Sequence, residues 1–205
     1  MIRFITQAIQ NYRQTGAIAP SSKKLACAMV RSMPNCNKQR ILEVGAGTGA
    51  FTKQVLCNLA EGDEFHIVEL NANFCEVLEK KILEPFRKEN QGIIVQLHNM
   101  PIEKSEFGGK FDAVICGLPF NNFPIEVVQH LFDVMFSVLK DDGELAYFEY
   151  LCMRGFKAWF GFPAIRLETK QRTMDVNDRF NTRNGTQSTV WWNLPPCRVV
   201  RLKQC

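Results

Sequence analysis

Residues 41–52 read ILEVGAGTGAFT. The apolar run ILEV is typical of a buried strand, and it leads directly into Gly45, Gly47 and Gly49 before a helical pattern begins. Glycine lets the backbone turn sharply and approach a ligand where a Cβ would collide. The stretch therefore predicts a strand, a tight turn and a helix that together hold a small-molecule cofactor.

The rest of the chain repeats this alternation of short apolar runs and helical patterns. Further strands are predicted at 65–70, 92–97, 111–118, 144–151, 188–194 and 197–203, a turn at 141–143, and helices at 51–60, 73–86 and 124–140. In the second helix Phe74, Val77, Leu78 and Ile82 are expected on one side. Strands separated by helices form right-handed βαβ units. We therefore expect an α/β, Rossmann-like, doubly wound sheet of seven strands, mostly parallel, with an antiparallel pair at its edge.

Length and composition fit one domain spanning 1–205. The chain is 46% hydrophobic and 22% charged, has no long apolar stretch of membrane-spanning type, and begins without the apolar block of a signal peptide. Eight cysteines lie at least eight residues apart, which excludes CxxC zinc sites, so no metal is expected. These features predict a cytoplasmic protein.

Charge is distributed unevenly along the chain. Residues 1–40 carry seven Lys or Arg and no acid, and residues 151–205 carry ten Lys or Arg against three acids, whereas the centre is acidic. Basic flanks indicate a large polyanionic partner, either nucleic acid or an anionic membrane surface, unless they only solvate the termini.

Two acids accompany the glycines. Glu43 precedes Gly45 by two residues, and Glu69 ends the second predicted strand. With the GxGxG spacing, they make the sequence similar to the class I S-adenosylmethionine-dependent methyltransferases, and less similar to dinucleotide enzymes with GxGxxG. The resemblance implies that Glu43 orders the loop around the methionine end of the cofactor. It also implies that Glu69 accepts hydrogen bonds from both ribose hydroxyls.

The same resemblance implies S-adenosylmethionine as cofactor and S-adenosylhomocysteine as product. The implied cofactor-binding residues are Glu43, Gly45, Ala46, Gly47, Gly49, Glu69, Leu70, Asn99, Met100 and Gly117. Asn99 stands where many relatives have an acid that contacts the adenine amino group, and its amide oxygen can accept the same hydrogen bond.

The segment after the fourth strand, CGLPFNNFP (116–124), partly resembles ribosomal RNA adenine dimethylases. Those enzymes carry Asn or Asp, then x-Pro-aromatic, to hold a flipped base. This chain keeps Pro119 and Phe120 but has Gly117 in place of the polar residue. We also do not expect it to carry the helical domain that usually follows in those enzymes.

Residues 16–29, 116–124 and 191–202 together resemble the bacterial phospholipid N-methyltransferases, which methylate phosphatidylethanolamine. This resemblance implies that residues 1–35 form a helical segment that docks on the membrane and closes the cofactor pocket over a catalytic core at 36–205. Phe148 and Tyr150 match the F-x-Y of that family.

Two segments have the composition of membrane-docking surfaces. In 1–14 apolar residues, among them Tyr12, recur at helical spacing opposite a polar side that includes two arginines, although a helix packed on a sheet has the same pattern. Residues 153–163 mix aromatics, including Trp159 and Phe160, with cations. Such a mixture suits a membrane interface, RNA stacking or a lid core.

An ammonium group must lose a proton before it can attack a methyl group, and Tyr150, Glu149 or His98 could accept that proton. We favour Tyr150 as the proton acceptor, and we expect Phe120 and Pro119 to be catalytic residues as well. Rings such as Tyr12, Phe120 and Tyr150 could hold the methylated cation.

The sequence thus predicts a monomeric phospholipid N-methyltransferase, peripherally bound to the inner face of the cell membrane. Its substrate would be phosphatidylethanolamine or its methylated derivatives. The alternatives are an RNA adenine N6-methyltransferase, a methyltransferase for a small soluble amine, and a cofactor-binding protein without catalysis.

Overall fold

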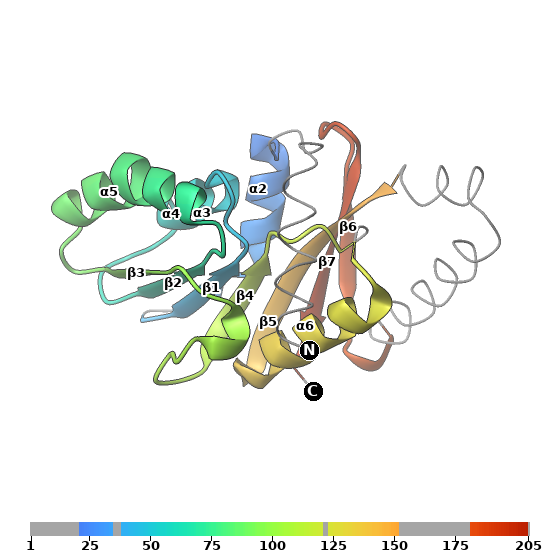
Figure 1. Ribbon diagram of the computed structural model, residues 1–205. Helices are drawn as coiled ribbons and strands as arrows, with labels where there is room; N and C mark the ends of the chain where they lie inside the picture. Colours follow the sequence, from blue (N-terminus) through green and yellow to red (C-terminus); the bar gives the residue numbers. More distant parts are fainter. Residues whose placement is uncertain (1–20, 35–37, 121–122, 152–180, 205) are drawn as a thin grey trace.

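A computed structural model describes residues 21–34, 38–120, 123–151 and 181–204. Within them, seven strands form one sheet in the order β3-β2-β1-β4-β5-β7-β6 (Figure 1). The strands are β1 (Arg40–Val44), β2 (Glu64–Val68), β3 (Ile94–His98), β4 (Phe111–Cys116), β5 (Leu139–Tyr150), β6 (Thr186–Val190) and β7 (Cys197–Lys203). Strands β1 to β5 are parallel, and β7 runs antiparallel to both β5 and β6. This confirms the predicted mixed sheet with its antiparallel edge.

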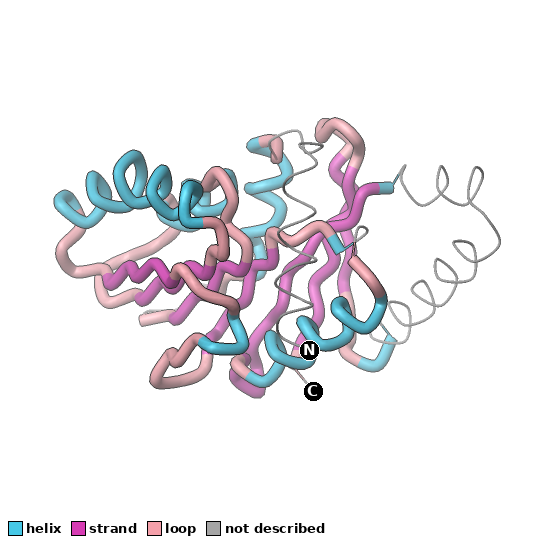
Figure 2. Tube along the Cα trace, in the orientation of Figure 1, coloured by secondary structure: helices cyan, strands magenta, loops and turns pink. Residues whose placement is uncertain are grey.

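Helices cover both faces of the sheet (Figures 1 and 2). They are α2 (Lys23–Met29), η1 (Val30–Ser32), α3 (Ala50–Leu56), α4 (Ala72–Leu78), η2 (Glu79–Leu83), α5 (Glu84–Glu89), η3 (Ile102–Lys104) and α6 (Ile125–Ser137). Residues of α2, α3, α4 and η2 pack on one face, and α6 packs on the other. The sheet therefore separates two apolar layers, as a doubly wound fold requires.

The helical region predicted at 73–86 extends over α4, η2 and α5, with a π-helical turn at η2. The Asn71 side chain begins it by accepting hydrogen bonds from two backbone amides. Leu78 and Ile82 are buried as expected, but Val77 is 38% exposed. The prediction for Val77 is wrong because the buried stripe follows Cys75, Leu78 and Ile82, three to four residues apart, and Val77 lies beside that stripe.

Several predicted boundaries are also wrong. The helices predicted at 51–60 and 124–140 end earlier, since α3 ends at Leu56 and α6 ends at Ser137. Residues 141–143 lie inside β5, whose pairing with β4 shifts between Phe111–Leu139 and Ala113–Glu144. Strand β6 ends at Val190, so residues 191–194 form the turn between β6 and β7. The turn is fixed by the buried Asn193 side chain, which donates hydrogen bonds to the Pro195 carbonyl and to Cys197 Sγ.

Tyr12, Trp159 and Phe160, and the helix expected within 1–14, lie outside the described residues. Among the residues that are described, no helix is long and apolar enough to cross a membrane.

Candidate cofactor and acceptor site

The glycine turn lies where β1 ends, at the carboxyl edge of the parallel strands. Gly45, Gly47 and Gly49 have φ angles of 79°, 58° and 84°, in the left-handed region that favours glycine. A Cβ on Gly49 would lie 2.5 Å from Ile82 Cδ1 and 2.8 Å from Leu78 Cδ2, whereas a Cβ on Gly47 would meet nothing within 4 Å. Gly49 therefore lets the second helical region pack closely on the turn. Gly47 borders open space.

Glu43 is fully buried beneath this turn, and its Oε2 accepts a hydrogen bond of 2.7 Å from Thr52 Oγ1. Its other oxygen, Oε1, has no hydrogen-bond partner among the described residues. Burial raises the pKa of Glu43 to about 8, while the hydrogen bond from Thr52 opposes the shift and the charge of Glu69 adds to it. A buried carboxyl with one oxygen unsatisfied matches a residue that completes its contacts when a polar ligand enters.

Glu69, also buried, ties the turn to the loop after β2. Its Oε2 accepts a hydrogen bond of 2.8 Å from the Gly47 amide, and its Oε1 accepts one of 2.7 Å from the Asn71 amide. Each carboxylate oxygen can accept more than one hydrogen bond, so these contacts orient the group and are compatible with the predicted ribose contacts.

Gly117, the first residue after β4, faces the glycine turn. Its amide donates a hydrogen bond of 2.8 Å to the Val44 carbonyl, and a Cβ at Gly117 would lie 2.6 Å from the Gly45 carbonyl oxygen. A side chain here would collide with backbone. The absence of the Asn or Asp found in adenine methyltransferases thus coincides with close packing of β4 on the turn.

Asn99 and Met100 directly follow β3, at the carboxyl edge of the parallel strands. Asn99 Nδ2 donates hydrogen bonds of 2.9 Å to the Glu69 carbonyl and 3.2 Å to the Leu70 carbonyl. Because the nitrogen is used in this way, Oδ1 is the acceptor atom of this amide, and the predicted contact with adenine would require such an acceptor. Met100 is partly exposed beside it, and Ala46 is buried within the turn, where its carbonyl accepts a hydrogen bond from Gly49.

The proposed catalytic residues occupy opposite faces of the sheet. Tyr150 is buried in the layer of α3, with its ring edge-on to Phe148 at 5.4 Å. Phe120 is buried in the layer of α6, where it packs on Phe132 at 4.9 Å and Tyr147 at 5.6 Å. Pro119 is buried next to it. The structure brings Tyr150 to the side of α3 and does not bring it to Phe120.

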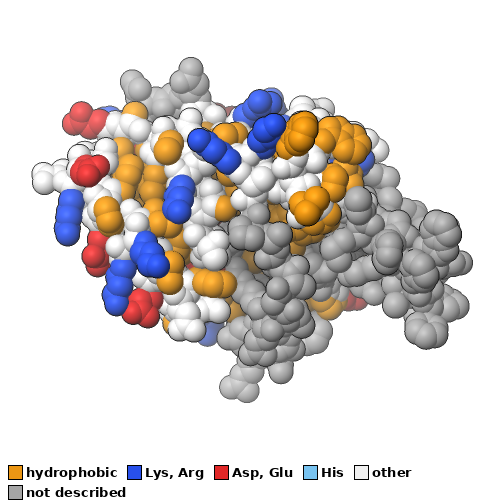
Figure 3. Space-filling model, turned by 90° about the horizontal axis from the view of Figure 1, so that it is seen from above, with side chains coloured by type: hydrophobic (Ala, Val, Ile, Leu, Met, Phe, Trp, Pro, Cys, Tyr) orange, Lys and Arg blue, Asp and Glu red, His pale blue; other side chains and the backbone are white. Residues whose placement is uncertain are grey.

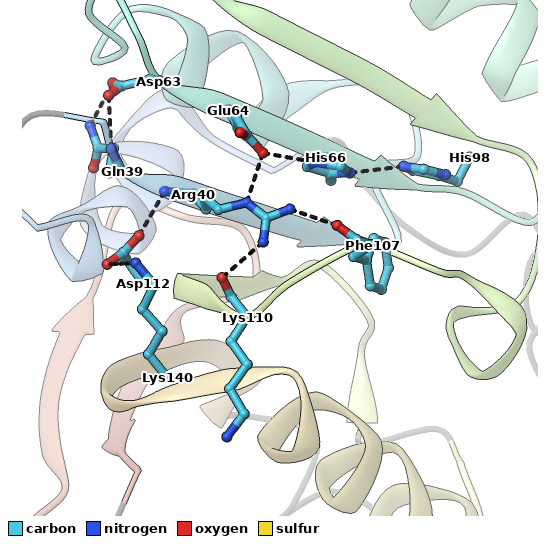
Figure 4. A network of polar contacts seen from close by, with 10 residues as sticks. All are labelled: Gln39, Arg40, Asp63, Glu64, His66, His98, Phe107, Lys110, Asp112 and Lys140. Carbon is cyan, nitrogen blue, oxygen red and sulfur yellow. Dashed lines mark hydrogen bonds and ion pairs between the residues drawn. The ribbon is translucent and has the colours of Figure 1, made fainter.

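Of the three candidate proton acceptors, His98 is the one that lies outside β5. It belongs to a polar network that runs across β1 to β4 (Figure 4). His66 Nδ1 and His98 Nε2 lie 3.0 Å apart, and their rings stack at 8°. Burial lowers the pKa of both histidines, which favours neutral rings. Arg40 continues the network through Glu64, 2.7 Å from its Nε.

The rest of the network lies at the amino ends of the strands, away from the glycine turn. Asp112 joins Arg40 and Lys140 there, and Asp63 accepts two hydrogen bonds from Gln39. These contacts join the amino ends of neighbouring strands to one another.

Sequence reasoning missed Thr52 and Asn71. Asn71 carried a visible signal, since asparagine just before a helical pattern is typical of an N-cap. Thr52 carried none, because its pairing with Glu43 depends on how α3 packs on β1.

Comparisons with known proteins agree with this geometry. Residues 41–143 match the family described as "Methyltransferase domain". The ornithine lipid N-methyltransferase of Singulisphaera acidiphila is 26% identical over 145 residues, which cover 68% of this chain and 72% of that protein.

Two solved structures share the fold. A proposed O-methyltransferase from Klebsiella pneumoniae has a TM-score of 0.63 at 12% identity, covering 98% of this chain and 90% of its own. An O-methyltransferase from Bacillus cereus, in complex with SAH, has a TM-score of 0.59 at 12% identity, covering 97% and 90%. Since the matched residues 41–143 make up half of the sequence and carry the glycine turn with both acids, the chain belongs to the methyltransferase domain family and is an S-adenosylmethionine-dependent methyltransferase.

Proposed function

We propose that the protein transfers a methyl group from S-adenosylmethionine to the amine of a membrane phospholipid, phosphatidylethanolamine or its methylated derivatives. The observation that carries the acceptor class is the similarity to an ornithine lipid N-methyltransferase, which acts by its name on a lipid amine. The resemblance of residues 16–29, 116–124 and 191–202 to phospholipid N-methyltransferases supports the same class.

The residues at the carboxyl edge fit the cofactor. Glu43 has an unsatisfied buried oxygen, Gly47 borders open space, and Asn99 presents an amide oxygen. Together with Glu69 they would hold a ligand that carries an ammonium group, two ribose hydroxyls and an adenine amine. When bound, S-adenosylmethionine supplies a methyl group on a positively charged sulfur. A carboxylate such as Glu43 suits such a cationic ligand, because opposite charge offsets the cost of burial.

The chain's own contribution to the reaction is positioning and proton removal. Methyl transfer is an in-line displacement, so holding the amine in line with the methyl group supplies most of the rate. We assign the proton acceptor to Tyr150, which would act as its phenolate and become a phenol when it takes the proton. It stands at the last position of β5 and joins α3 through the ring contacts of Phe148 and Phe51. Pro119 and Phe120 follow Gly117 after Leu118 and are proposed to shape the acceptor side from the face of the sheet opposite Tyr150.

In this proposal the chain works as one catalytic unit, with residues 1–35 as its lid. Tyr12, Trp159 and Phe160 are retained as proposed contacts to lipid, on the basis of the sequence alone.

The test is transfer of radiolabelled methyl from S-adenosylmethionine to three acceptors in parallel. These are vesicles with phosphatidylethanolamine, vesicles with ornithine lipid, and unmodified ribosomal RNA. Label in the phosphatidylethanolamine extract, abolished or strongly reduced in Glu69→Ala, supports the proposal, and thin-layer separation counts the methyl groups. Label in ornithine lipid alone, or in RNA alone, would refute it.

The role of Tyr150 is tested by Tyr150→Phe, which keeps the ring and removes the hydroxyl. We expect lower turnover with cofactor affinity unchanged, as calorimetry would measure. Phe148→Leu serves as the control, because it alters the ring that packs on Tyr150 and leaves the Tyr150 hydroxyl in place. Turnover of Tyr150→Phe equal to wild type would remove Tyr150 from the mechanism.

A further inference from the structure

The turn between β6 and β7 exposes three large apolar side chains. Trp191, Trp192 and Leu194 are 71%, 78% and 84% exposed, the highest values among the large hydrophobic residues that the structure describes. A soluble surface rarely displays such residues side by side unless they contact a partner. We call these three residues the hairpin tip.

Hydrogen bonds of Asn193 anchor the hairpin tip to the fold. Asn193, between the exposed residues, is buried, and its Oδ1 accepts a hydrogen bond of 2.9 Å from the Ser22 amide at the start of α2. Its Nδ2 donates to the Pro195 carbonyl at 2.9 Å and to Cys197 Sγ at 3.1 Å. Anchoring one residue of the turn in this way directs its neighbours outward, so their exposure is a built feature of the fold.

The tip is surrounded by positive charge. Lys23 and Lys24 are exposed at the start of α2, and Lys24 Nζ lies 4.6 Å from the centre of the Trp192 ring. Residues 21–34 and 181–204 contain no Asp or Glu. In the view from above, hydrophobic side chains gather beside Lys and Arg side chains on this side of the molecule (Figure 3). Tryptophan prefers the headgroup level of a bilayer, and lysine is attracted to anionic lipids.

The tip also lies at the same edge of the sheet as the candidate site. Tyr150, the last residue of β5, pairs with Cys197, the first residue of β7, and the Leu151 amide donates a hydrogen bond of 2.9 Å to the Pro196 carbonyl. Because β1, β2 and β4 run parallel to β5, their carboxyl ends, with the glycine turn, Glu69 and Gly117, meet at this edge (Figure 1). A bilayer that receives the tip therefore faces the edge at which an acceptor enters.

From this juxtaposition we propose that the hairpin tip, with Lys23 and Lys24, inserts into the headgroup region of an anionic bilayer. The inference deepens the proposed function, on which its biological meaning rests, by naming the surface that docks. It is separate from the docking expected of residues 1–14 and 153–163.

Fluorescence reports directly on the tip, because the chain has three tryptophans and two of them belong to it. In a Trp159→Phe background the emission comes from Trp191 and Trp192 alone. We expect a blue shift when vesicles containing phosphatidylglycerol are added, and quenching when the lipids carry bromine on the upper acyl chain. Emission that stays unchanged while the protein sediments with the vesicles would overturn the proposal, since docking would then occur elsewhere.

Affinity gives the second measurement. The triple change Trp191→Ser, Trp192→Ser and Leu194→Ser should weaken vesicle binding by at least about tenfold, because the buried apolar area is lost. Ile94→Ser, at a site 49% exposed at the amino end of β3, is the matched control and should bind as wild type. Equal affinity of the triple variant and wild type refutes the docking surface.

A third measurement tests the contribution of the two lysines' charge to vesicle binding. Lys23→Gln with Lys24→Gln should weaken binding roughly fivefold per lysine on anionic vesicles and leave binding to neutral vesicles nearly unchanged. Lys81→Gln with Lys88→Gln, exposed on the helical region at the other end of the sheet, is the control. Equal losses in the two pairs would mean that net charge, and no particular surface, drives binding.

Activity on dispersed lipid separates this inference from the proposed function. The triple variant should methylate a soluble short-chain phosphatidylethanolamine as wild type does and lose activity only on vesicles. If wild type methylates no lipid in either form but its tip emission still shifts on vesicles, the docking surface stands and the proposed function falls. If wild type methylates vesicle lipid while the tip emission is unchanged, the proposed function stands and the docking surface falls.

Discussion

Replacing Glu43 by glutamine removes a buried ionisable group from the centre of the site. Burial raises the pKa of Glu43 to about 8 from an ordinary value of 4.5. Below pH 4.5 the carboxyl is protonated in both the folded and the unfolded chain, and no penalty arises. Between pH 4.5 and 8 only the unfolded chain ionises, so the free energy of unfolding falls by about 1.4 kcal/mol per pH unit.

The penalty worked from these values is about 3 kcal/mol at pH 7 and about 1 kcal/mol or less at pH 5. Glutamine keeps an oxygen for Thr52 Oγ1 and does not ionise. Its amide nitrogen takes the place of the unsatisfied oxygen at a cost that is the same at every pH. The stability of Glu43→Gln relative to wild type should therefore rise by about 3 kcal/mol between pH 5 and pH 7.5.

Urea unfolding without cofactor, followed by circular dichroism at several pH values, measures this difference. Glu61→Gln, on the exposed surface, is the control and should show a small, constant difference from wild type. Parallel pH profiles of wild type and Glu43→Gln would refute the argument that a buried, destabilising carboxyl is retained at this position. Above pH 8, where Glu43 is ionised, the same variant should bind S-adenosylmethionine at least about tenfold more weakly because it lacks that charge, and calorimetry tests that half of the argument.

Three further outcomes follow from single contacts. Gly117→Ala places a Cβ 2.6 Å from the Gly45 carbonyl oxygen, so it should destabilise the fold by about 1–3 kcal/mol and weaken cofactor binding; a fully active variant of unchanged melting temperature contradicts this. Asn193→Ala removes the hydrogen bond that joins the hairpin to Ser22 at the start of α2, together with two hydrogen bonds within the turn, and should cost about 2–4 kcal/mol in urea unfolding, with faster hydrogen exchange at the Ser22 amide. The pKa of buried His66 is lowered, so stability should be full above its ordinary value of 6.5 and decline as the pH falls below it. His66→Gln should flatten that decline in thermal unfolding, and an unaltered slope would mean that other groups cause it.

The chain's periodicity was sufficient to predict the sheet and its edge. Alternating apolar runs and helical patterns left βαβ units as the only arrangement that buries both faces of the strands. Glycine spacing and the two acids located the cofactor edge, because parallel strands end at one edge and only glycine allows close backbone approach. These features depend on residues close together in the chain, so they can be recognised in the sequence.

Boundaries and pairings across the sheet were decided by tertiary packing. The run WWNL has strand composition, but the contacts of Asn193 with Ser22 and Cys197 turn it into the hairpin tip. Such contacts join residues far apart in the sequence, and no local pattern encodes them.

The sequence by itself determined that this chain is an α/β domain with a glycine turn flanked by two acids. Only the tertiary structure decided that Glu43 keeps an unsatisfied oxygen and that Phe120 and Tyr150 lie on opposite faces. It also decided that two tryptophans stand exposed at the edge where the site lies. The physical reason is that burial, charge and exposure depend on which distant segments meet, whereas turns and periodicity depend on neighbours along the chain.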